Sequence, residues 1–204
     1  MRTIAIQAGG QSRRMGRDKA LVLLGGQPMI QHVVDRVRDL AEEILVTTNH
    51  PEEFAFLGVR LTSDTRPGAG ALAGLRTALA AARGESVLVL ACDLPFVSRP
   101  LVGHLWSRSG EADVVVPRRG GEFEPLHAVY ARSVLPAVEA ALEAGKARMI
   151  SFFPDVHVLP IEQEELALFD PSGTSFLNVN TPQELIEAEA LLVRPPQAGA
   201  SHAS

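Results

Sequence analysis

The stretch TIAIQAGGQSRRMGRDK, residues 3–19, places a short apolar segment directly before a glycine-rich, basic loop. The apolar segment is bounded by glycines, which favours a buried strand. Gly9 and Gly10 can adopt backbone conformations closed to other residues, so that N–H groups of the loop can face an anion. Arg13 and Lys19 add full positive charge to this loop. The stretch therefore predicts a strand that leads into a polyphosphate-binding loop, although it lacks the Gly-Lys-Ser/Thr ending of the common phosphate loop.

Strands and helices are predicted to alternate along the rest of the chain. Apolar residues recur at helical spacing in some segments, and short apolar runs between turn residues indicate strands. The predicted strands are residues 3–8, 43–48, 59–62, 86–91, 113–116 and 126–130, with extended segments at 156–159 and 176–177. The predicted helices are residues 28–40, 71–82, 100–108, 133–143 and a last helix capped by Thr181, before a disordered tail at residues 194–204. This order predicts one α/β domain with a mostly parallel sheet and helices on both faces.

Polar residues follow several of the predicted strands. Asn49, Asp64 and Asp93 each come after a strand, and ligands of parallel sheets bind beyond the carboxyl ends of the strands. We therefore expect these residues to lie at one edge with the first loop, although Asn and Asp are also common in plain turns. Mg²⁺ usually takes one or two carboxylates together with phosphates and water, so Asp93 is predicted as a Mg²⁺ ligand. Cys92 is expected to be a small buried side chain rather than a nucleophile.

Composition excludes several classes of protein. The formal net charge of −5 argues against a broad surface for nucleic acid. The single cysteine excludes an intramolecular disulfide and a multi-cysteine metal site. The first apolar run is too short for a secretory signal, and no stretch approaches the roughly 20 apolar residues that cross a bilayer. These features predict a cytoplasmic protein that binds neither nucleic acid nor a membrane.

One segment suggests another class of enzyme. Residues 68–73, GAGALA, satisfy the G-x-G-x-x-G/A pattern of dinucleotide-binding dehydrogenases and precede a predicted helix. That pattern is expected directly after a strand, whereas the nearest predicted strand ends near Thr62. The basic loop at residues 9–19 is the richer phosphate-binding feature, and the dehydrogenase is therefore the weaker alternative.

The assembled motifs resemble the molybdenum cofactor guanylyltransferase family, a group of Rossmann-like nucleotidyltransferases. AGGQSRRMGRDKALVLLGGQPMI at residues 8–30 is similar to the family's LAGGxSxRMGxDKxLLxxxGxPLI signature, and Gln7 stands where the family usually has leucine. Further similar segments are PGAGALAG at 67–74, ACDLP at 91–95, EPLHAVY at 124–130 and FLNVNTP at 176–182. The resemblance implies a single three-layer α/β/α nucleotidyltransferase domain at residues 1–193. Its nucleotide-binding half would extend to about residue 100 and its acceptor-binding half from about 101.

The resemblance also implies an activity, the transfer of GMP from GTP to Mo-molybdopterin, which yields the guanine dinucleotide cofactor and pyrophosphate. It places Lys19 near the α-phosphate, Arg13 and the loop N–H groups at the β- and γ-phosphates, and Asp93 at Mg²⁺, and these three residues would form the catalytic set. Asn49 and Asp64 are assigned to the nucleoside. The nucleotide-binding residues carried over are Ala8, Gly9, Gly10, Gln11, Ser12, Arg13, Gly16, Lys19, Asn49, Asp64, Gly70, Leu72 and Asp93.

The acceptor-binding residues that the resemblance implies are Asn178, Asn180 and His127. His127 has an alternative role, because a histidine in an apolar strand is commonly a hydrogen-bonded core residue. Molybdoenzymes or other proteins of cofactor biosynthesis are implied as further partners.

Two other functions stay open. A related nucleotidyltransferase would use CTP on the molybdenum cofactor or act on a sugar or polyol phosphate, because no side chain of the sequence identifies the base. A catalytically silent protein would bind the nucleotide or deliver the cofactor. The presence of Lys19, Asp64 and Asp93 favours an enzyme over the silent protein.

Overall fold

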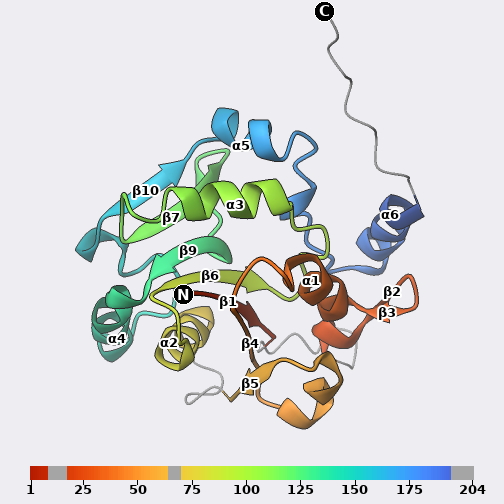
Figure 1. The fold of residues 1–204 in the computed structure, drawn as a ribbon, viewed down its shortest axis with the longest axis horizontal. Coiled ribbons are helices and arrows are strands. Elements are labelled where there is room, and N and C mark those ends of the chain that lie inside the picture. Colours follow the sequence, from red (N-terminus) through yellow and green to blue (C-terminus); the bar gives the residue numbers. More distant parts are fainter. Residues whose placement is uncertain (9–17, 64–69, 194–204) are drawn as a thin grey trace, which may run out of the picture.

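The computed structural model describes residues 1–8, 18–63 and 70–193 of the chain. The strands of its central sheet are β1 (Arg2–Gln7), β4 (Glu43–Thr47), β5 (Arg60–Thr62), β6 (Ser86–Ala91), β7 (Val114–Arg119), β8 (Glu122–Phe123), β9 (His127–Ala131) and β10 (Val158–Ile161). Their order is β10-β7-β9-β6-β1-β4-β5, with β8 paired to β7 (Figure 1). β1 and β6 lie at the centre of the sheet, and five of the six residues in each strand are buried.

Most strand pairs are parallel. β1 pairs in parallel with β4 and with β6, β4 pairs with β5, and β10 pairs with β7. β9 runs antiparallel between β6 and β7. The short β8 is also antiparallel, because Gly120 and Gly121 adopt positive φ angles of 55° and 85° and make a tight turn after β7. The predicted mostly parallel sheet is confirmed.

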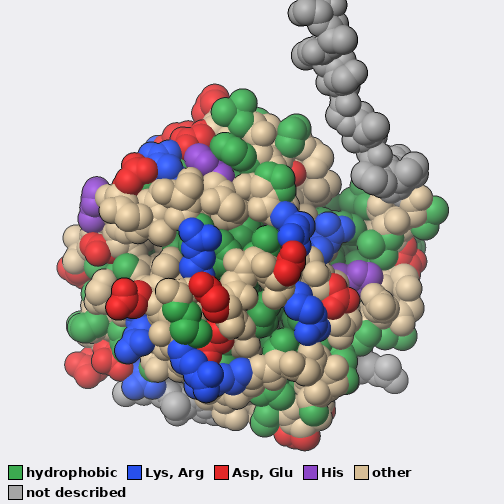
Figure 2. Space-filling model, viewed as in Figure 1, with side chains coloured by type: hydrophobic (Ala, Val, Ile, Leu, Met, Phe, Trp, Pro, Cys, Tyr) green, Lys and Arg blue, Asp and Glu red, His purple; other side chains and the backbone are tan. Residues whose placement is uncertain are grey.

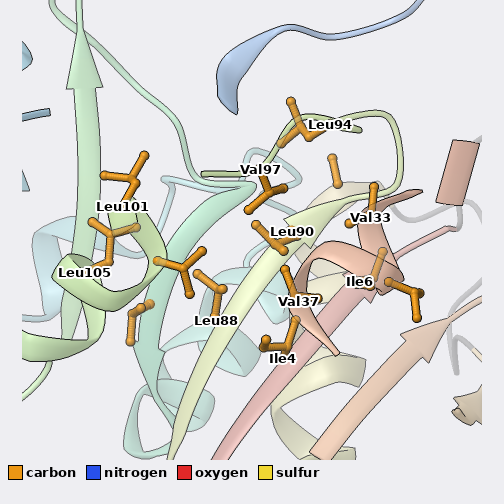
Figure 3. Packing of buried hydrophobic residues seen from close by; sticks show 14 of the residues in the cluster. Ile4, Ile6, Val33, Val37, Leu88, Leu90, Leu94, Val97, Leu101 and Leu105 are labelled. Atoms are coloured by element: carbon orange, nitrogen blue, oxygen red, sulfur yellow. The ribbon is translucent and has the colours of Figure 1, made fainter. Parts of the chain in front are cut away.

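Helices cover both faces of the sheet (Figure 1). On one face, α1 (Met29–Val37), α3 (Arg99–Ser107) and α5 (Gln163–Phe169) pack on a core that includes Ile4 and Ile6 of β1 (Figure 3). On the other face, α2 (Ala71–Ala81) and α4 (Leu135–Glu143) pack on a core that includes Ala5. Successive side chains of a strand point to opposite faces, which accounts for this division. The three-layer α/β/α arrangement is confirmed.

The predicted apolar stripe of the first helix is confirmed. Its residues lie one helical turn apart or less and are fully buried: Met29, Ile30, Val33, Val34 and Val37. Burial of each such side chain contributes about 1.5–3 kcal/mol relative to leaving it in water, so the stripe fixes α1 on the sheet.

The last helix packs against a hairpin formed by residues 23–28. α6 (Pro182–Val193) packs against the hairpin of β2 (Leu23–Leu24) and β3 (Gln27–Pro28) through a small separate core. This core also contains Phe96, from the turn after β6, and Val179, from the segment before α6. The turn after β6, the hairpin and α6 are thereby held together, although they come from distant parts of the sequence.

Some expected elements differ in the structure. An extended segment was expected at 176–177, and this is wrong for Phe176, which ends the 3₁₀ turn η5 (Thr174–Phe176). Gly173 precedes this turn with a φ of 65°, and Asp170 stabilises the turn by accepting a hydrogen bond from Ser175 N at 2.9 Å. β10 lies two residues later than the extended segment expected at 156–159. The elements not predicted from the sequence include α5, the hairpin strands β2 and β3, and the 3₁₀ segment η2 (Pro51–Leu57).

The surface charge is mixed on the face shown in Figure 2, where basic and acidic side chains are interspersed. Ion pairs within the described residues include Arg99 with Asp39, whose charged atoms lie 2.6 Å apart. Within residues 1–8, 18–63 and 70–193, no helix combines the length and the apolar character that a membrane span requires.

Candidate functional site

The carboxyl ends of three central strands meet at one edge of the sheet, as predicted. Gln7 at the end of β1 lies opposite Thr47 of β4 and Ala91 of β6. Beyond these pairs, Ala8 N donates to Thr47 O at 2.9 Å and Cys92 N donates to the carbonyl oxygen of Gln7 at 3.2 Å. Ala8, Asn49 and Asp93 therefore follow strands that end at this edge.

Lys19 lies at the centre of this edge. It begins the 3₁₀ turn η1 (Lys19–Leu21), which Asp18 caps by accepting a hydrogen bond from Ala20 N at 3.0 Å. The Lys19 Nζ atom donates to Asp93 Oδ2 and to Asn180 Oδ1. The structure thus joins a predicted catalytic lysine, a predicted metal ligand and a predicted acceptor-binding residue.

The two carboxylate oxygens of Asp93 differ in their contacts with the described residues. The Lys19 and Asp93 side chains are each 16% exposed, and Asp93 Oδ2 accepts from Lys19. Asp93 Oδ1 is buried, and no hydrogen-bond partner for it is recorded in the described part of the chain. A buried carboxylate oxygen without a partner is costly, so this atom is suited to a ligand such as a cation. Among the described residues, no cluster of three or more His, Cys, Asp or Glu side chains is arranged to hold a metal. Mg²⁺ usually takes one or two carboxylates together with phosphates and water, and Asp93 could supply one such carboxylate.

Asn180 is held in place from the backbone. Val179 N donates to the carbonyl oxygen of Asp93 at 3.2 Å, which pins the segment before α6 to the turn after β6. Asn180 N donates to Glu184 Oε2 at 2.6 Å, and Thr181 N donates to the same oxygen at 2.8 Å. The predicted cap is confirmed, because Glu184 N donates in return to Thr181 Oγ1 at 3.2 Å.

Cys92 adjoins Asp93 but is not suited to nucleophilic chemistry. Burial, with a smaller contribution from the Asp93 carboxylate, raises the pKa of the Cys92 thiol well above its ordinary value. A thiol of that kind carries almost no thiolate at neutral pH, and the thiolate is the nucleophilic form. Cys92 is only partly buried against the core, so the expectation of a non-nucleophilic side chain is supported and that of a fully buried one is not.

Gln7 lies beneath the first turns of α2. Its side chain is on the α2 face of the sheet and only 7% exposed. Gly74 makes room for it, because a Cβ atom at position 74 would lie 2.7 Å from Gln7 Oε1. Gln7 Nε2 is buried, and within the described part of the chain it has no hydrogen-bond partner. The sequence singled out this position through its departure from the family's leucine.

The structure describes only some of the other predicted nucleotide-binding residues. Gly70 precedes α2 with a φ of 86°, a conformation that favours glycine. The Leu72 side chain is fully buried in the core, so only its backbone can meet a ligand. Asn49 is exposed at the end of β4. The remaining predicted site residues, Gly9, Gly10, Gln11, Ser12, Arg13, Gly16 and Asp64, lie outside the described residues.

The predicted acceptor residues divide into two groups. Asn178 and Asn180 are exposed beside the Lys19 edge. His127 is only 1% exposed and packs with its ring centre 5.0 Å from that of Phe176, so it occupies a core position. Within the described residues neither ring nitrogen has a recorded hydrogen-bond partner, so the hydrogen-bonded part of its alternative role is not seen. Burial lowers the pKa of His127 to about 4, against opposing contributions from the Ser175 backbone and Asp170.

A cavity of about 260 Å³ opens near the same edge and was not foreseen from sequence. Its lining residues are Glu122, Phe123, Pro125, Arg148, Met149 and Ile150. Pro125 precedes Leu126, whose carbonyl oxygen accepts a hydrogen bond from Ala91 N at 3.0 Å, so the cavity adjoins the carboxyl end of β6. No local sequence motif indicates this cavity, because its walls come from two separate segments, residues 122–125 and 148–150.

The sequence and the fold of this chain are similar to those of known proteins. Residues 4–157 match the family model of the MobA-like NTP transferase domain. The chain is 37% identical over 189 residues to a probable molybdenum cofactor guanylyltransferase of Pelotomaculum thermopropionicum, covering 93% of this chain and 92% of that one. It is 41% identical over 182 residues to a probable molybdenum cofactor guanylyltransferase of Carboxydothermus hydrogenoformans, covering 89% and 92%. The crystal structure of molybdopterin-guanine dinucleotide biosynthesis protein A from Archaeoglobus fulgidus superposes with a TM-score of 0.81 and 28% identity, covering 93% of this chain and 98% of that one.

Proposed function

Because the chain belongs to the molybdenum cofactor guanylyltransferase family, within the MobA-like NTP transferases, we propose that it transfers GMP from GTP to the terminal phosphate of Mo-molybdopterin. The products are the guanine dinucleotide form of the cofactor and pyrophosphate. The single observation that carries the proposal is the meeting of Lys19, Asp93 and Asn180 at the carboxyl edge of the sheet.

The reaction requires alignment and charge compensation. An oxygen of the acceptor phosphate forms a bond to the α-phosphorus of GTP, while the bond from that phosphorus to the oxygen bridging to the β-phosphorus breaks. Both reactants are polyanions, so positioned cations lower the barrier more than any covalent chemistry of the protein would. Lys19 is the described cation at this edge, and its contacts with Asp93 and Asn180 orient its ammonium group.

Nucleotidyltransferases typically use a divalent metal, and we assign Mg²⁺ here. Asp93 Oδ1 is buried and has no recorded hydrogen-bond partner among the described residues, which supports Asp93 as the protein ligand. A single carboxylate suits Mg²⁺, which takes most of its remaining ligands from phosphates and water. When bound, Mg²⁺ offsets the negative charge of the triphosphate. Asp93 in turn would hold the metal and Lys19 at adjacent positions.

The two substrates are assigned to the two halves of the domain. The nucleotide would bind to residues up to about 100, which include Ala8, Asn49 and Gly70. The acceptor would bind to residues from about 101 to 193. Exposed Asn178 and Asn180 and the cavity beside β8 support this second assignment, because all lie near the edge that carries Lys19.

The test is a panel of nucleoside triphosphates with molybdopterin cofactor as acceptor. GTP with Mg²⁺ should release pyrophosphate and yield the dinucleotide product, whereas ATP, CTP and UTP should release little. Preferred use of CTP would replace guanylyl transfer by cytidylyl transfer at the same site. Absence of pyrophosphate with every triphosphate, despite nucleotide binding, would favour the catalytically silent delivery protein.

A further inference from the structure

The beginning of α6 shares its anchoring residue with the Lys19 site. Glu184 Oε2 accepts hydrogen bonds from Thr181 N at 2.8 Å and from Asn180 N at 2.6 Å. In a simple capping box, the glutamate in the first turn accepts from the residue that caps the helix, which is Thr181 here. The second bond, to Asn180, reaches the residue whose side chain contacts Lys19.

We propose that Glu184 is a positioning residue for the transfer reaction: its carboxylate fixes the backbone of Asn180 so that the Asn180 side chain holds the Lys19 ammonium group beside Asp93. The inference rests on the proposed function, because it concerns the same lysine. Under this proposal Glu184, a residue of α6, contributes to the reaction without contacting a reacting atom.

The segment that carries Asn180 is pinned on both sides. On the N-terminal side, Val179 is 3% exposed and its N–H group donates to the Asp93 carbonyl at 3.2 Å. On the C-terminal side, Glu184 holds Asn180 and Thr181. With the backbone fixed at both ends, the Asn180 Cα atom is held within reach of Lys19, and the Asn180 Oδ1 atom accepts from Lys19 Nζ.

The charge of Glu184 strengthens this anchor. The Asn180 N–H bond is the main cause that lowers the pKa of Glu184, opposed by partial loss of water and supported by Thr181 and by the charge of Lys19. The carboxylate is therefore ionised at neutral pH. Hydrogen bonds to an ionised acceptor are stronger than those between neutral groups, so Glu184 is well suited to hold a backbone segment at the surface.

Three variants separate positioning from helix stability. Glu184→Ala removes the acceptor for Asn180 and Thr181. Thr181→Ala is the matched control, because it weakens the same helix cap without removing the Glu184 bond to Asn180. Glu184→Gln keeps an oxygen acceptor at the same place and removes only the charge. Glu184→Ala and Thr181→Ala should lower Tm by similar amounts of a few degrees.

Steady-state kinetics should then divide the variants. Glu184→Ala should lower kcat by about ten- to a hundredfold, as expected for a displaced catalytic group, with KM for GTP within about twofold of the parent. Thr181→Ala should keep kcat within about twofold, and Glu184→Gln should recover most of the loss. Equal kcat in Glu184→Ala and Thr181→Ala, or no recovery in Glu184→Gln, overturns the proposal.

A spectroscopic measurement tests the contact without substrates. The chain contains two lysines, Lys19 and Lys146, so their Nζ signals in ¹⁵N-lysine-labelled full-length protein are assigned with a single Lys146→Arg variant. The Lys19 signal should shift in Glu184→Ala and stay in place in Thr181→Ala. An unchanged Lys19 signal in Glu184→Ala overturns the positioning role, and a shifted signal supports it. Both outcomes hold even if the parent protein shows no guanylyl transfer, because the measurement needs no substrate.

Discussion

The ammonium group of Lys19 contacts the carboxylate of Asp93, although 74 residues separate them in the chain. Lys19 follows the loop after β1 and Asp93 follows β6, and these two strands are neighbours in the sheet. Parallel pairing therefore brings the residues together at one edge. Under the proposed function the pair would combine a cation for the α-phosphate with a carboxylate for the metal, so each residue has its own test.

Lys19→Ala should retain nucleotide binding and lose turnover. A cation that acts mainly on transition-state charge contributes about a hundredfold or more to turnover, whereas several other groups share the ground-state binding of a triphosphate. Pyrophosphate release and equilibrium binding of GTP with Mg²⁺ measure the two effects. Arg38→Ala is the control, because it removes an exposed cation from the end of α1 and should leave both quantities unchanged. Near-normal turnover of Lys19→Ala would remove the catalytic role.

Asp93→Asn should abolish the Mg²⁺-dependent part of nucleotide binding and leave the fold intact. The amide keeps the size of the side chain, but a neutral oxygen is a weaker ligand for a hard cation than a carboxylate. GTP affinity is measured with Mg²⁺ and with EDTA, and Mn²⁺ binding is followed by electron paramagnetic resonance. If Mg²⁺ raises GTP affinity in the variant as much as in the parent, Asp93 is not the metal ligand.

The sheet and its edge were predictable because their signals are local. The apolar stripe of α1 and the buried run of β6 are visible in the sequence, and parallel strands place Asn49 and Asp93 at the edge that β1 reaches. The antiparallel direction of β9 was not predictable, since it depends on the path of the chain through the turn at Gly120 and Gly121. α5 was also not predicted. Only one of its seven residues, Leu166, is buried, so its sequence shows no apolar repeat at helical spacing.

The site was predictable in its residue types more than in its contacts. Lys19, Asp93 and Asn180 were all singled out, yet the contact from Lys19 to Asn180 joins positions 161 residues apart, and no spacing rule reaches that far. It depends on the packing of α6 against the β2–β3 hairpin. The sequence did not determine whether His127 is buried. A strand pattern predicts which face of the sheet a side chain points to, but not how completely the helices on that face cover it.

Gln7→Leu should stabilise the fold. The Gln7 Nε2 atom is buried without a hydrogen-bond partner in the described part of the chain, and burial of an unpaired polar group costs about 1–3 kcal/mol. Leucine has a similar size and no polar atom, so the free energy of unfolding in urea should rise by about 1 kcal/mol. The same triphosphate panel on this variant reports whether the amide also affects base selection. A fall in stability would show that the amide has a partner in the folded protein.

Gly74→Ala provides the matched test of that packing. In the parent protein the added Cβ would lie 2.7 Å from Gln7 Oε1, so the Gln7 side chain would have to move. Because Gln7 is only 7% exposed, it has little room to do so, and overpacking of this kind costs about 1–3 kcal/mol. In a Gln7→Ala background the obstacle is gone, and alanine should instead stabilise α2 by about 0.5–1 kcal/mol relative to glycine. The change of sign between the two backgrounds, measured by urea unfolding, isolates the contact. The same effect in both backgrounds would place Gln7 away from Gly74.

His127 should make the folded state sensitive to acid. Its pKa is lowered from 6.5 to about 4, mainly by burial, so the folded protein disfavours the charged ring. Above about pH 6.5 the ring is neutral in both states and has no effect on the pH dependence. As the pH falls below 6.5, the unfolded chain takes up a proton that the folded protein accepts only near pH 4, so stability is lost across this window. A shift of that size corresponds to a loss on the order of 3 kcal/mol.

His127→Leu lacks the titrating ring, and its free energy of unfolding in urea should fall less than that of the parent between pH 7 and pH 4. A constant difference between the two proteins across this range would contradict the buried, neutral state of His127.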